Sequence, residues 1–450
     1  MFLTVPVLLS GCSTLDSLAP DLGLGSSAPS TPQTSGLVVS DEPFAAQSGA
    51  AVLAQGGSAA DAVSAMFFTM TATYPVAAGL GGGGICLVRD AGGQTREFDF
   101  LPRAAAGGGA YAVPGAVAGF YDLQKAFGTL PWQRVVAAGE AYAAAGFPIS
   151  HVLEQRLQAA QSVIRLDAAL SAEFLDESGH VKPEGTVVMN RPLSVTLGTV
   201  RLGGGDGFYK GPVATAIAAY SAAQGGHVTA GELAAYRDGQ TPARLVNVGG
   251  FTAAIADAHT GAGAFAGALL ANLSRGDATN EGAVVAALRQ TLAGFHVASL
   301  PSDLGATGFA ALDKGGGAAA CAVTLNGPFG SGHTAGDTGV LLAAAPDSAA
   351  GLSAAFLAPV IASDSNGQVA LSGAGAGGPN GTAAAMLALE RMAAGMPLAQ
   401  ESDLRSTGLA PFVTVNVISC QNGICVALPD PGGHGLGTAA ADQGAPAAAP

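Results

Sequence analysis

The sequence predicts a layered α/β fold, of the α+β kind, in which both halves of the chain supply strands. Apolar segments bounded by glycine and charged residues collect towards the two ends of the 450-residue chain, and helix-like segments fill the middle. Hydrophobic residues make up 49% of the chain and charged residues only 11%, which is enough material for a large core. Sheets built from distant segments, with helices packed on them, satisfy these observations.

The charge balance argues against one class of partner. The net charge is −14, whereas nucleic-acid binding requires a basic face. The seven histidines show no HxH or HxxxH spacing, so neither a metal site nor another cofactor is expected.

The N-terminus resembles a bacterial lipoprotein signal. Residues 1–12 form an apolar run that ends in Leu-Ser-Gly-Cys, and cleavage before Cys12 would leave that cysteine for lipidation. Residues 13–37 are rich in Ser, Pro, Gly and Thr, which is typical of a disordered tether. We therefore expect a periplasmic protein that contacts a membrane only through its lipid anchor, since the apolar run is too short to span a bilayer. An ordinary disordered terminus is the alternative.

The first ordered elements are a strand and a helix within 37–55, followed by an apolar helix that Ser58 caps and Pro75 ends. Glycines at 79–84 then lead into a strand at 85–89. A phosphate-binding loop would lie between a strand and a following helix. Here a helix precedes the glycines, so nucleotide binding is not expected.

The middle of the chain is mainly helical. A second strand covers 95–100, and Thr229 with Glu232 predicts a capping box. A strand at 251–256 precedes two more helices. The helices are expected at about 115–127, 131–145, 152–169, 193–202, 212–224, 262–273 and 281–298.

A hairpin at 302–332 carries the candidate chemistry. Its strands cover 308–313 and 318–325, and Thr324 and Asn326 lie where the second strand leaves the sheet. Thr307, at the front of the first strand, is expected beside that pair across the hairpin. A hydroxyl that faces a second hydroxyl and an amide suits a nucleophile site. The alternative is a buried hairpin whose threonines only satisfy backbone groups.

The last third continues with strands at 340–342 and 358–362, a strand and glycine loop at 369–378, and a helix at 381–396. Residues 429–450 consist mainly of Gly, Ala and Pro, which predicts a disordered tail.

The cysteines fall into two groups. Cys86 and Cys321 lie in apolar strand patterns and are expected simply as buried core residues. Cys420 and Cys425 flank an Asn-Gly pair, which predicts a type I′ hairpin. That register makes them a non-hydrogen-bonded pair, close enough for a disulfide, which an exported chain permits.

Several segments, taken together and in order, resemble the γ-glutamyltransferase (glutathione hydrolase) family over about residues 38–398. The resemblance implies a four-layer αββα N-terminal nucleophile hydrolase fold, with 38–305 as the large-subunit part and 306–428 as the small-subunit part. The segments are GGSAADAV at 56–63, GLGGGGICLV at 79–88, VPGAVAGF at 113–120, GTLPWQRVVAAGEAYAAAGFPIS at 128–150, GFYKGPVA at 207–214, GGHVTAGELAAYR at 225–237 and the hairpin up to FGSG at 329–332.

The family resemblance also implies a reaction. A proenzyme cleaves itself, and the new N-terminal threonine attacks a γ-glutamyl amide while its own α-amine acts as base. An acyl-enzyme forms, and water or an acceptor amine releases it. The expected partner is thus a small-molecule γ-glutamyl (glutathione-like) or related amide.

Carried over residue by residue, the nucleophile position falls on Ala306 and the following family threonine on Thr307. Thr324 matches the threonine beside the nucleophile, and Asn326 matches the asparagine that holds the glutamyl amino-acid end. The Gly377 and Gly378 pair matches the glycines whose N–H groups form an oxyanion hole.

The positions that would grip the charged ends of a glutamyl group are altered. Arg103 is the candidate for the carboxylate-binding arginine, although it lies two residues further along the sequence than the family's arginine. The amino-group positions fall on Ala345 and Ser348, with Asp347 beside them as a candidate. Ala355 and Phe356 replace a serine pair. An apolar pocket compensates a zwitterionic group poorly. We therefore do not expect this chain to bind its substrate in the way that the family binds glutathione.

Two hypotheses follow. In the first, the chain is a hydrolase whose nucleophile is Thr307, one residue out of register, although such a slip turns a side chain to the other face of a strand. In the second, Ala306 marks a catalytically inactive, uncut pseudoenzyme that serves as a periplasmic binding or interaction lipoprotein.

Overall fold

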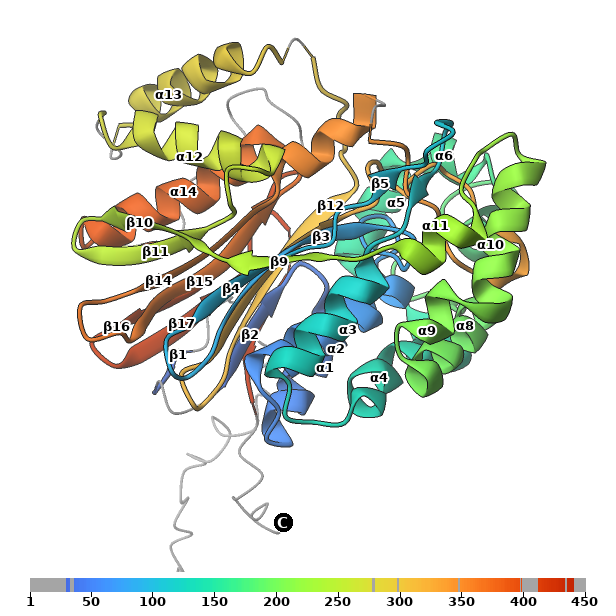
Figure 1. Ribbon diagram of the computed structural model, residues 1–450, viewed down its shortest axis with the longest axis horizontal. Helices are drawn as coiled ribbons and strands as arrows, with labels where there is room; N and C mark the ends of the chain where they lie inside the picture. The colour runs from blue at the N-terminus through green and yellow to red at the C-terminus, as the bar shows by residue number, and fades with distance from the viewer. Residues whose placement is uncertain are drawn as a thin grey trace, which may run out of the picture.

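Two sheets of seven strands each lie face to face between two layers of helices (Figure 1). This computed structural model describes residues 30–32, 36–276, 280–297, 299–346, 349–396, 398, 412–433 and 435–440. The predicted α/β fold class and its four-layer αββα arrangement are therefore confirmed.

The first sheet contains the candidate hairpin at its centre, and all of its neighbouring strands are antiparallel. In spatial order it consists of β18 (Leu436–Ala439), β2 (Leu37–Ser40), β12 (Ala306–Leu312), β13 (Ala318–Thr324), β3 (Gly83–Arg89), β4 (Thr95–Asp99) and β9 (Gly239–Pro242).

The second sheet comes mainly from the C-terminal third of the chain. Its order is β1 (Ser30–Pro32), β17 (Ile424–Leu428), β16 (Thr414–Gln421), β15 (Val369–Ala376), β14 (Ala358–Ser363), β11 (Phe251–Ile255) and β10 (Arg244–Val248). The two sheets bury small apolar side chains, many of them alanines, between their facing surfaces.

Helices from the first half of the chain cover the outer face of the first sheet and continue into a helical lobe (Figure 1). They are α1 (Pro43–Ala54), α2 (Ala59–Thr73), α3 (Ala116–Phe127), α4 (Trp132–Ala145), α5 (His151–Ala159), α6 (Gln161–Ile164), α7 (Ala168–Phe174), α8 (Arg191–Gly203), α9 (Asp206–Tyr209), α10 (Gly211–Ala223) and α11 (Ala230–Ala235). The second sheet is covered by α12 (Gly261–Leu273), α13 (Glu281–Gly294) and α14 (Pro379–Ala393). Short elements complete the fold: β5 (Arg103–Ala104) pairs with β6 (Ala112–Val113), β7 (Phe147–Pro148) pairs with β8 (Val187–Val188), and η1 (Gly336–Thr338) and η2 (Ala349–Phe356) are 3₁₀ segments.

Helix α2 is the central helix beneath the first sheet, and every one of its residues is buried. Ser58 caps it as predicted, and Asp61 completes a capping box with the Ser58 backbone. The predicted capping box of Thr229 and Glu232 is also present, at the start of α11. Because these caps satisfy free N–H groups locally, they are readable from short stretches of sequence.

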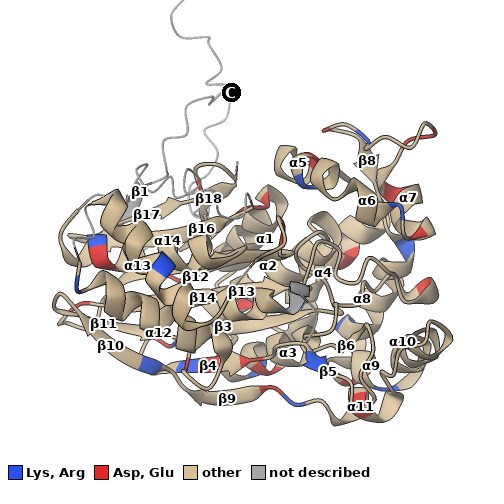
Figure 2. Ribbon diagram, turned by 90° about the horizontal axis from the view of Figure 1, so that it is seen from above, with Lys and Arg blue, Asp and Glu red and all other residues tan. Residues whose placement is uncertain are grey.

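Charged residues are sparse in the described part of the chain, and Lys and Arg are scattered singly over many elements (Figure 2). None of the helices described is long and apolar enough to cross a membrane.

Three expectations for the strands and termini need correction. Within residues 340–342, Leu341 and Leu342 form isolated bridges and no strand, and the expected tail from 429 is wrong in part because Leu436–Ala439 pairs with β2. Ser30–Pro32, within the expected tether, pairs with β17. Exposed edge strands offer unpaired backbone groups, which these short segments satisfy.

The disulfides confirm one expectation and overturn another. Cys420 and Cys425 are directly paired across the β16–β17 hairpin and form the predicted disulfide, with Asn422 and Gly423 in the turn. Cys86 and Cys321 are buried as expected, but they also form a disulfide that was not predicted, because β3 and β13 place them directly opposite each other. Cys12, the predicted lipidation site, lies outside the described residues.

Candidate active site

The register of the β12–β13 hairpin decides which face each candidate side chain occupies. Ala306 lies directly opposite Thr324, and Thr307 lies opposite Val323. Side chains alternate between the faces of a strand. Ala306 therefore faces the space between the sheets, where it packs with Ala322, Ala374 and Ala376. Thr307 faces the helix layer, so the expectation that it lies beside Thr324 and Asn326 is wrong.

On the inter-sheet face, Thr324 and Asn326 lie together as predicted. The Thr324 hydroxyl lies 2.7 Å from the Ser353 hydroxyl, donates to the Gly305 carbonyl at 3.1 Å, and accepts from the Asn326 backbone N–H at 2.8 Å. Asn326 adopts a left-handed conformation with φ 57°, and its Nδ2 donates to the Ala344 carbonyl at 2.9 Å. The Asn326 Oδ1 atom is buried and has no hydrogen-bond partner in the described part of the chain. A buried acceptor of this kind suits a substrate N–H group.

Gly377 and Gly378 connect β15 to the N-terminus of α14, with φ values of 87° and 137°. A Cβ atom on Gly377 would lie 2.0 Å from the Phe412 carbonyl oxygen, so only glycine fits there. The preceding residue, Ala376, belongs to the same apolar cluster as Ala306. The glycine pair therefore follows directly on the inter-sheet cluster that contains Ala306, at a helix end that favours negative charge.

The structure does not bring Arg103 into this group. Arg103 is exposed on β5, and its guanidinium lies 4.9 Å from the centre of the Tyr236 ring. Leu101, two residues earlier, packs instead against the cluster that contains Ala306. An apolar side chain, that of Leu101, thus lies beside the cluster in place of the expected arginine.

The other substrate positions carry no charged group where the structure describes them. Asp347 and Ser348 lie outside the described residues. Ala345 is buried, and Phe356 packs edge-on against Phe265 at 5.0 Å between ring centroids.

On the opposite face of β12, Thr307 belongs to a buried polar network that the sequence did not reveal. Its Oγ1 donates to Oδ2 of Asp41 at 2.7 Å. The other oxygen, Asp41 Oδ1, accepts from Asn416 Nδ2 at 2.8 Å, and the same Nδ2 also donates to the Gly308 carbonyl at 2.8 Å. The partners come from opposite ends of the chain, so no local pattern could have signalled them.

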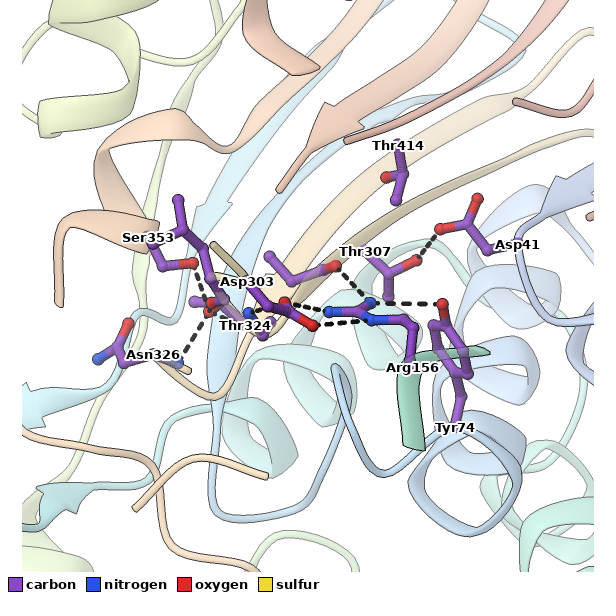
Figure 3. A network of polar contacts seen from close by, with 12 residues as sticks. Asp41, Tyr74, Arg156, Asp303, Thr307, Thr324, Asn326, Ser353 and Thr414 are labelled. Carbon is purple, nitrogen blue, oxygen red and sulfur yellow. Dashed lines mark hydrogen bonds and ion pairs between the residues drawn. The ribbon is translucent and has the colours of Figure 1, made fainter. Parts of the chain in front are cut away.

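Arg156 of α5 is another site residue that the sequence did not reveal (Figure 3). It forms a buried ion pair with Asp303 through two hydrogen bonds. Its Nη1 donates to the Ala306 carbonyl at 3.2 Å and to the Tyr74 hydroxyl at 3.3 Å. Burial lowers the pKa of Arg156, but the charge of Asp303 and the contacts with Asp303 and Tyr74 together raise it by more, so the guanidinium stays charged.

The end of strand β2 explains why this carbonyl is available. Ser40, the last residue of β2, pairs with Phe309, so the first residues of β12 extend beyond their neighbour on that side. The Ala306 and Gly308 carbonyls therefore accept hydrogen bonds from side chains, those of Arg156 and Asn416. At the Ala306–Thr307 peptide bond, the Asp41 carboxylate thus contacts the Thr307 hydroxyl, and the Arg156 guanidinium contacts the Ala306 carbonyl oxygen.

Comparison with known proteins gives a consistent set of relatives. The model of the gamma-glutamyltranspeptidase family matches residues 45–292. The glutathione hydrolase proenzyme of Escherichia coli (strain K12) is 30% identical over 223 residues, which cover 45% of this chain and 38% of that protein. The acylase ACY 1 proenzyme of Pseudomonas sp. (strain SE83) is 29% identical over 229 residues, which cover 45% of this chain and 41% of that protein. The matched part therefore spans about two-fifths of the length of these relatives.

Solved structures extend the likeness over the whole fold. A cephalosporin acylase from Bacillus halodurans superposes with a TM-score of 0.75 and 18% identity, covering 96% of this chain and 99% of that one. The gamma-glutamyltranspeptidase of Helicobacter pylori gives a TM-score of 0.52 and 24% identity, covering 57% of this chain and 81% of that one. At these identities the likeness establishes the fold and leaves the chemistry to the site residues.

Proposed function

The chain belongs to the gamma-glutamyltranspeptidase family, and on this basis we propose that it is a self-processing N-terminal nucleophile hydrolase with Thr307 as its nucleophile. Family membership and fold support an enzyme of the hydrolase and transferase class. The single observation that supports Thr307 is its 2.7 Å hydrogen bond to the Asp41 carboxylate. A carboxylate that accepts the proton of a hydroxyl is the arrangement by which a weak nucleophile is activated.

The first step is cleavage of the Ala306–Thr307 peptide bond. Thr307 Oγ1 attacks the Ala306 carbonyl carbon, and its proton passes to Asp41. The C–N bond then breaks, the nitrogen takes the proton from Asp41, and an ester joins Ala306 to the threonine oxygen. Water hydrolyses this ester, which leaves a carboxylate on Ala306 and a free α-amine on Thr307.

The cut also offers a way for Thr307 to reach the other face of β12. As the first residue of its chain, Thr307 is no longer fixed on its N-terminal side, so rotation about its Cα–C bond can turn the side chain away from the helix side of β12 while the amine moves to another position around Cα. The hydroxyl then points towards Thr324, Asn326 and the glycine pair, which occupy the inter-sheet side.

The amide substrate would react at that side. The threonine oxygen attacks the amide carbonyl while the α-amine takes its proton and passes it to the leaving amine. The N–H groups of Gly377 and Gly378 would hold the oxyanion, and Asn326 Oδ1 would accept from a substrate N–H. Water or an acceptor amine then releases the acyl group. We propose a γ-glutamyl-related amide with a less charged acyl part, because Leu101 occupies the side expected to hold a carboxylate clamp.

A second candidate is a pseudoenzyme, an uncut protein that binds small amides at the same place without forming an acyl-enzyme. The observation that favours it is the position of Ala306, which stands opposite Thr324 and offers no hydroxyl there.

Intact-mass spectrometry of the reduced, denatured protein tests the two candidates. Two chains, the smaller beginning at Thr307, would support the hydrolase. A smaller chain beginning at Ala306 would indicate an external protease, and one uncut chain would support the binding protein. Reduction is required because Cys86 and Cys321 link the two parts.

We also propose that the protein is exported and anchored through Cys12. Two disulfides support an oxidising compartment. Membrane fractionation of cells expressing the wild type and Cys12→Ser tests this location, since only the wild type is expected in the detergent-soluble membrane fraction.

A further inference from the structure

We propose that Arg156 is a catalytic residue of chain cleavage: its guanidinium stabilises the negative charge that develops on the Ala306 carbonyl oxygen when Thr307 attacks. The inference rests on the proposed self-cleavage, and it assigns the stabilisation of the oxyanion in that step to a residue outside the hairpin. The Nη1 atom of Arg156 already donates to this oxygen at 3.2 Å (Figure 3).

The contact is fixed from both sides. Asp303 holds the guanidinium through its Nε and Nη2 atoms, and it also accepts from the Gly305 N–H at 2.8 Å. One carboxylate thus ties Arg156 to the backbone immediately before the bond to be cut. A planar guanidinium held by two parallel hydrogen bonds has little freedom, so its remaining donor is aimed before the reaction begins.

The burial of this ion pair is informative. The side chains of Arg156 and Asp303 are only 3% and 6% exposed. A buried ion pair contributes little to stability compared with apolar packing, because both charges must be desolvated. The same low dielectric strengthens the effect of the guanidinium on a nearby developing charge. The arrangement is therefore better explained by the carbonyl that it contacts than by stability.

Tyr74 provides an uncharged second acceptor for the same Nη1 atom, at 3.3 Å. Burial raises the pKa of the Tyr74 hydroxyl, so it remains protonated. As negative charge grows on the Ala306 oxygen, that oxygen becomes the stronger of the two acceptors. Nη1 can then shift towards it without breaking the bonds to Asp303.

The proton and electron balance needs no other group. The Thr307 proton goes to Asp41, and the carbonyl electron pair moves onto the oxygen that Arg156 contacts. When the intermediate collapses, this pair re-forms the carbonyl, the C–N bond breaks, and the nitrogen recovers the proton from Asp41. Arg156 keeps its own protons throughout.

The test compares cleavage rates of newly synthesised full-length chains, followed on reducing gels. Arg156→Lys keeps a positive charge beside Asp303 but cannot maintain both the paired bonds and the carbonyl contact. We expect cleavage to slow about 100-fold, as for the loss of one oxyanion donor. Arg165→Lys is the matched control, because Arg165 also donates to a carbonyl, that of Gly179, but is exposed to solvent. Its rate should equal that of the wild type.

Two further measurements separate this role from a structural one. Thermal melting of the uncleaved Thr307→Ala chain with and without Arg156→Lys shows whether the variant is folded. Tyr74→Phe removes the other acceptor of Nη1 and leaves the contact with the Ala306 carbonyl, so its cleavage should be as fast as in the wild type. Wild-type speed in a folded Arg156→Lys chain, or slow cleavage in Tyr74→Phe, would overturn the inference and leave the proposed function intact. An uncut wild type would overturn both.

Discussion

Thr307 and Asp41 are 266 residues apart in the sequence, yet the hydroxyl of one donates to the carboxylate of the other at 2.7 Å within the core. The contact exists because β2 ends at Ser40 beside β12, which places the next residue, Asp41, against the start of β12. Both side chains are fully or almost fully buried. A carboxylate and a hydroxyl in this position, next to a peptide bond whose oxygen is held by Arg156, form a reactive group around a single backbone bond.

The first prediction concerns this pair. Asp41→Asn removes the proton acceptor but keeps the size of the side chain, so chain cleavage should slow by about 100-fold or more. Thr307→Ala should abolish cleavage, and Thr307→Ser should retain it. The measurement is the fraction of cleaved chain against time on reducing gels. Thr215→Ala, which removes an exposed hydroxyl from α10, serves as a control and should cleave normally. Unchanged cleavage in Asp41→Asn would contradict the assigned base.

The second prediction concerns the disulfide between Cys86 and Cys321, which lie on opposite sides of the proposed cut. The cleaved protein should migrate as one species under denaturing conditions without reductant, and as two after reduction. The double variant Cys86→Ala/Cys321→Ala should separate without reductant. The variant Cys420→Ala/Cys425→Ala should not, because that disulfide lies within the smaller part. Separation of the unreduced wild type would contradict the predicted link.

The candidate site was predictable from the sequence where local rules govern it. The Asn-Gly turn and its disulfide, the caps at Ser58 and Thr229, and the proximity of Thr324 to Asn326 follow from spacing over a few residues. The main difference from expectation is the face of β12 on which Thr307 lies. Because Ala306 is the residue opposite Thr324, Thr307 points to the helix side of the sheet.

The remaining site residues depend on contacts between distant segments. Arg156 reaches Asp303 and the Ala306 carbonyl from a helix about 150 residues earlier, and Asn416 reaches Asp41 across most of the chain. The disulfide between Cys86 and Cys321 likewise requires knowing that β3 and β13 are neighbours. A single sequence carries no register information for such pairs.

The third prediction is a dependence of stability on pH that arises from Glu42, next to Asp41. Glu42 caps α1, and burial raises its pKa to about 7. The folded state therefore holds this proton more tightly than the unfolded chain, so stability should fall as pH rises from about 4.5 to about 7. The expected loss in the free energy of unfolding is of the order of 3 kcal/mol, because each unit of pKa difference corresponds to about 1.4 kcal/mol.

The variant Glu42→Gln isolates the contribution of Glu42 to the pH dependence of stability. The amide keeps an acceptor for Ala45 N–H and Thr73, and its NH₂ group takes the place of Oε1, which has no hydrogen-bond partner in the described residues. Denaturant melts at pH 5 and pH 8 should therefore show a smaller difference for Glu42→Gln than for the wild type. Glu177→Gln, an exposed change, should behave as the wild type does. Equal differences in all three proteins would contradict the assignment to Glu42.

The fourth prediction tests which residue the fold can use as a nucleophile. Ala306→Thr places a hydroxyl on the inter-sheet face, directly opposite Thr324. The larger side chain must fit among Ala322, Ala374 and Ala376, so we expect a loss of stability of about 1–3 kcal/mol. If the frame around Thr324 and the glycine pair is intact, the Ala306→Thr/Thr307→Ala double variant should cleave itself between positions 305 and 306. The mass of the smaller chain distinguishes this cut from one at 306–307. A folded double variant that remains uncut would show that the inter-sheet face no longer supports cleavage, and the reactive group would then be confined to Thr307, Asp41 and Arg156.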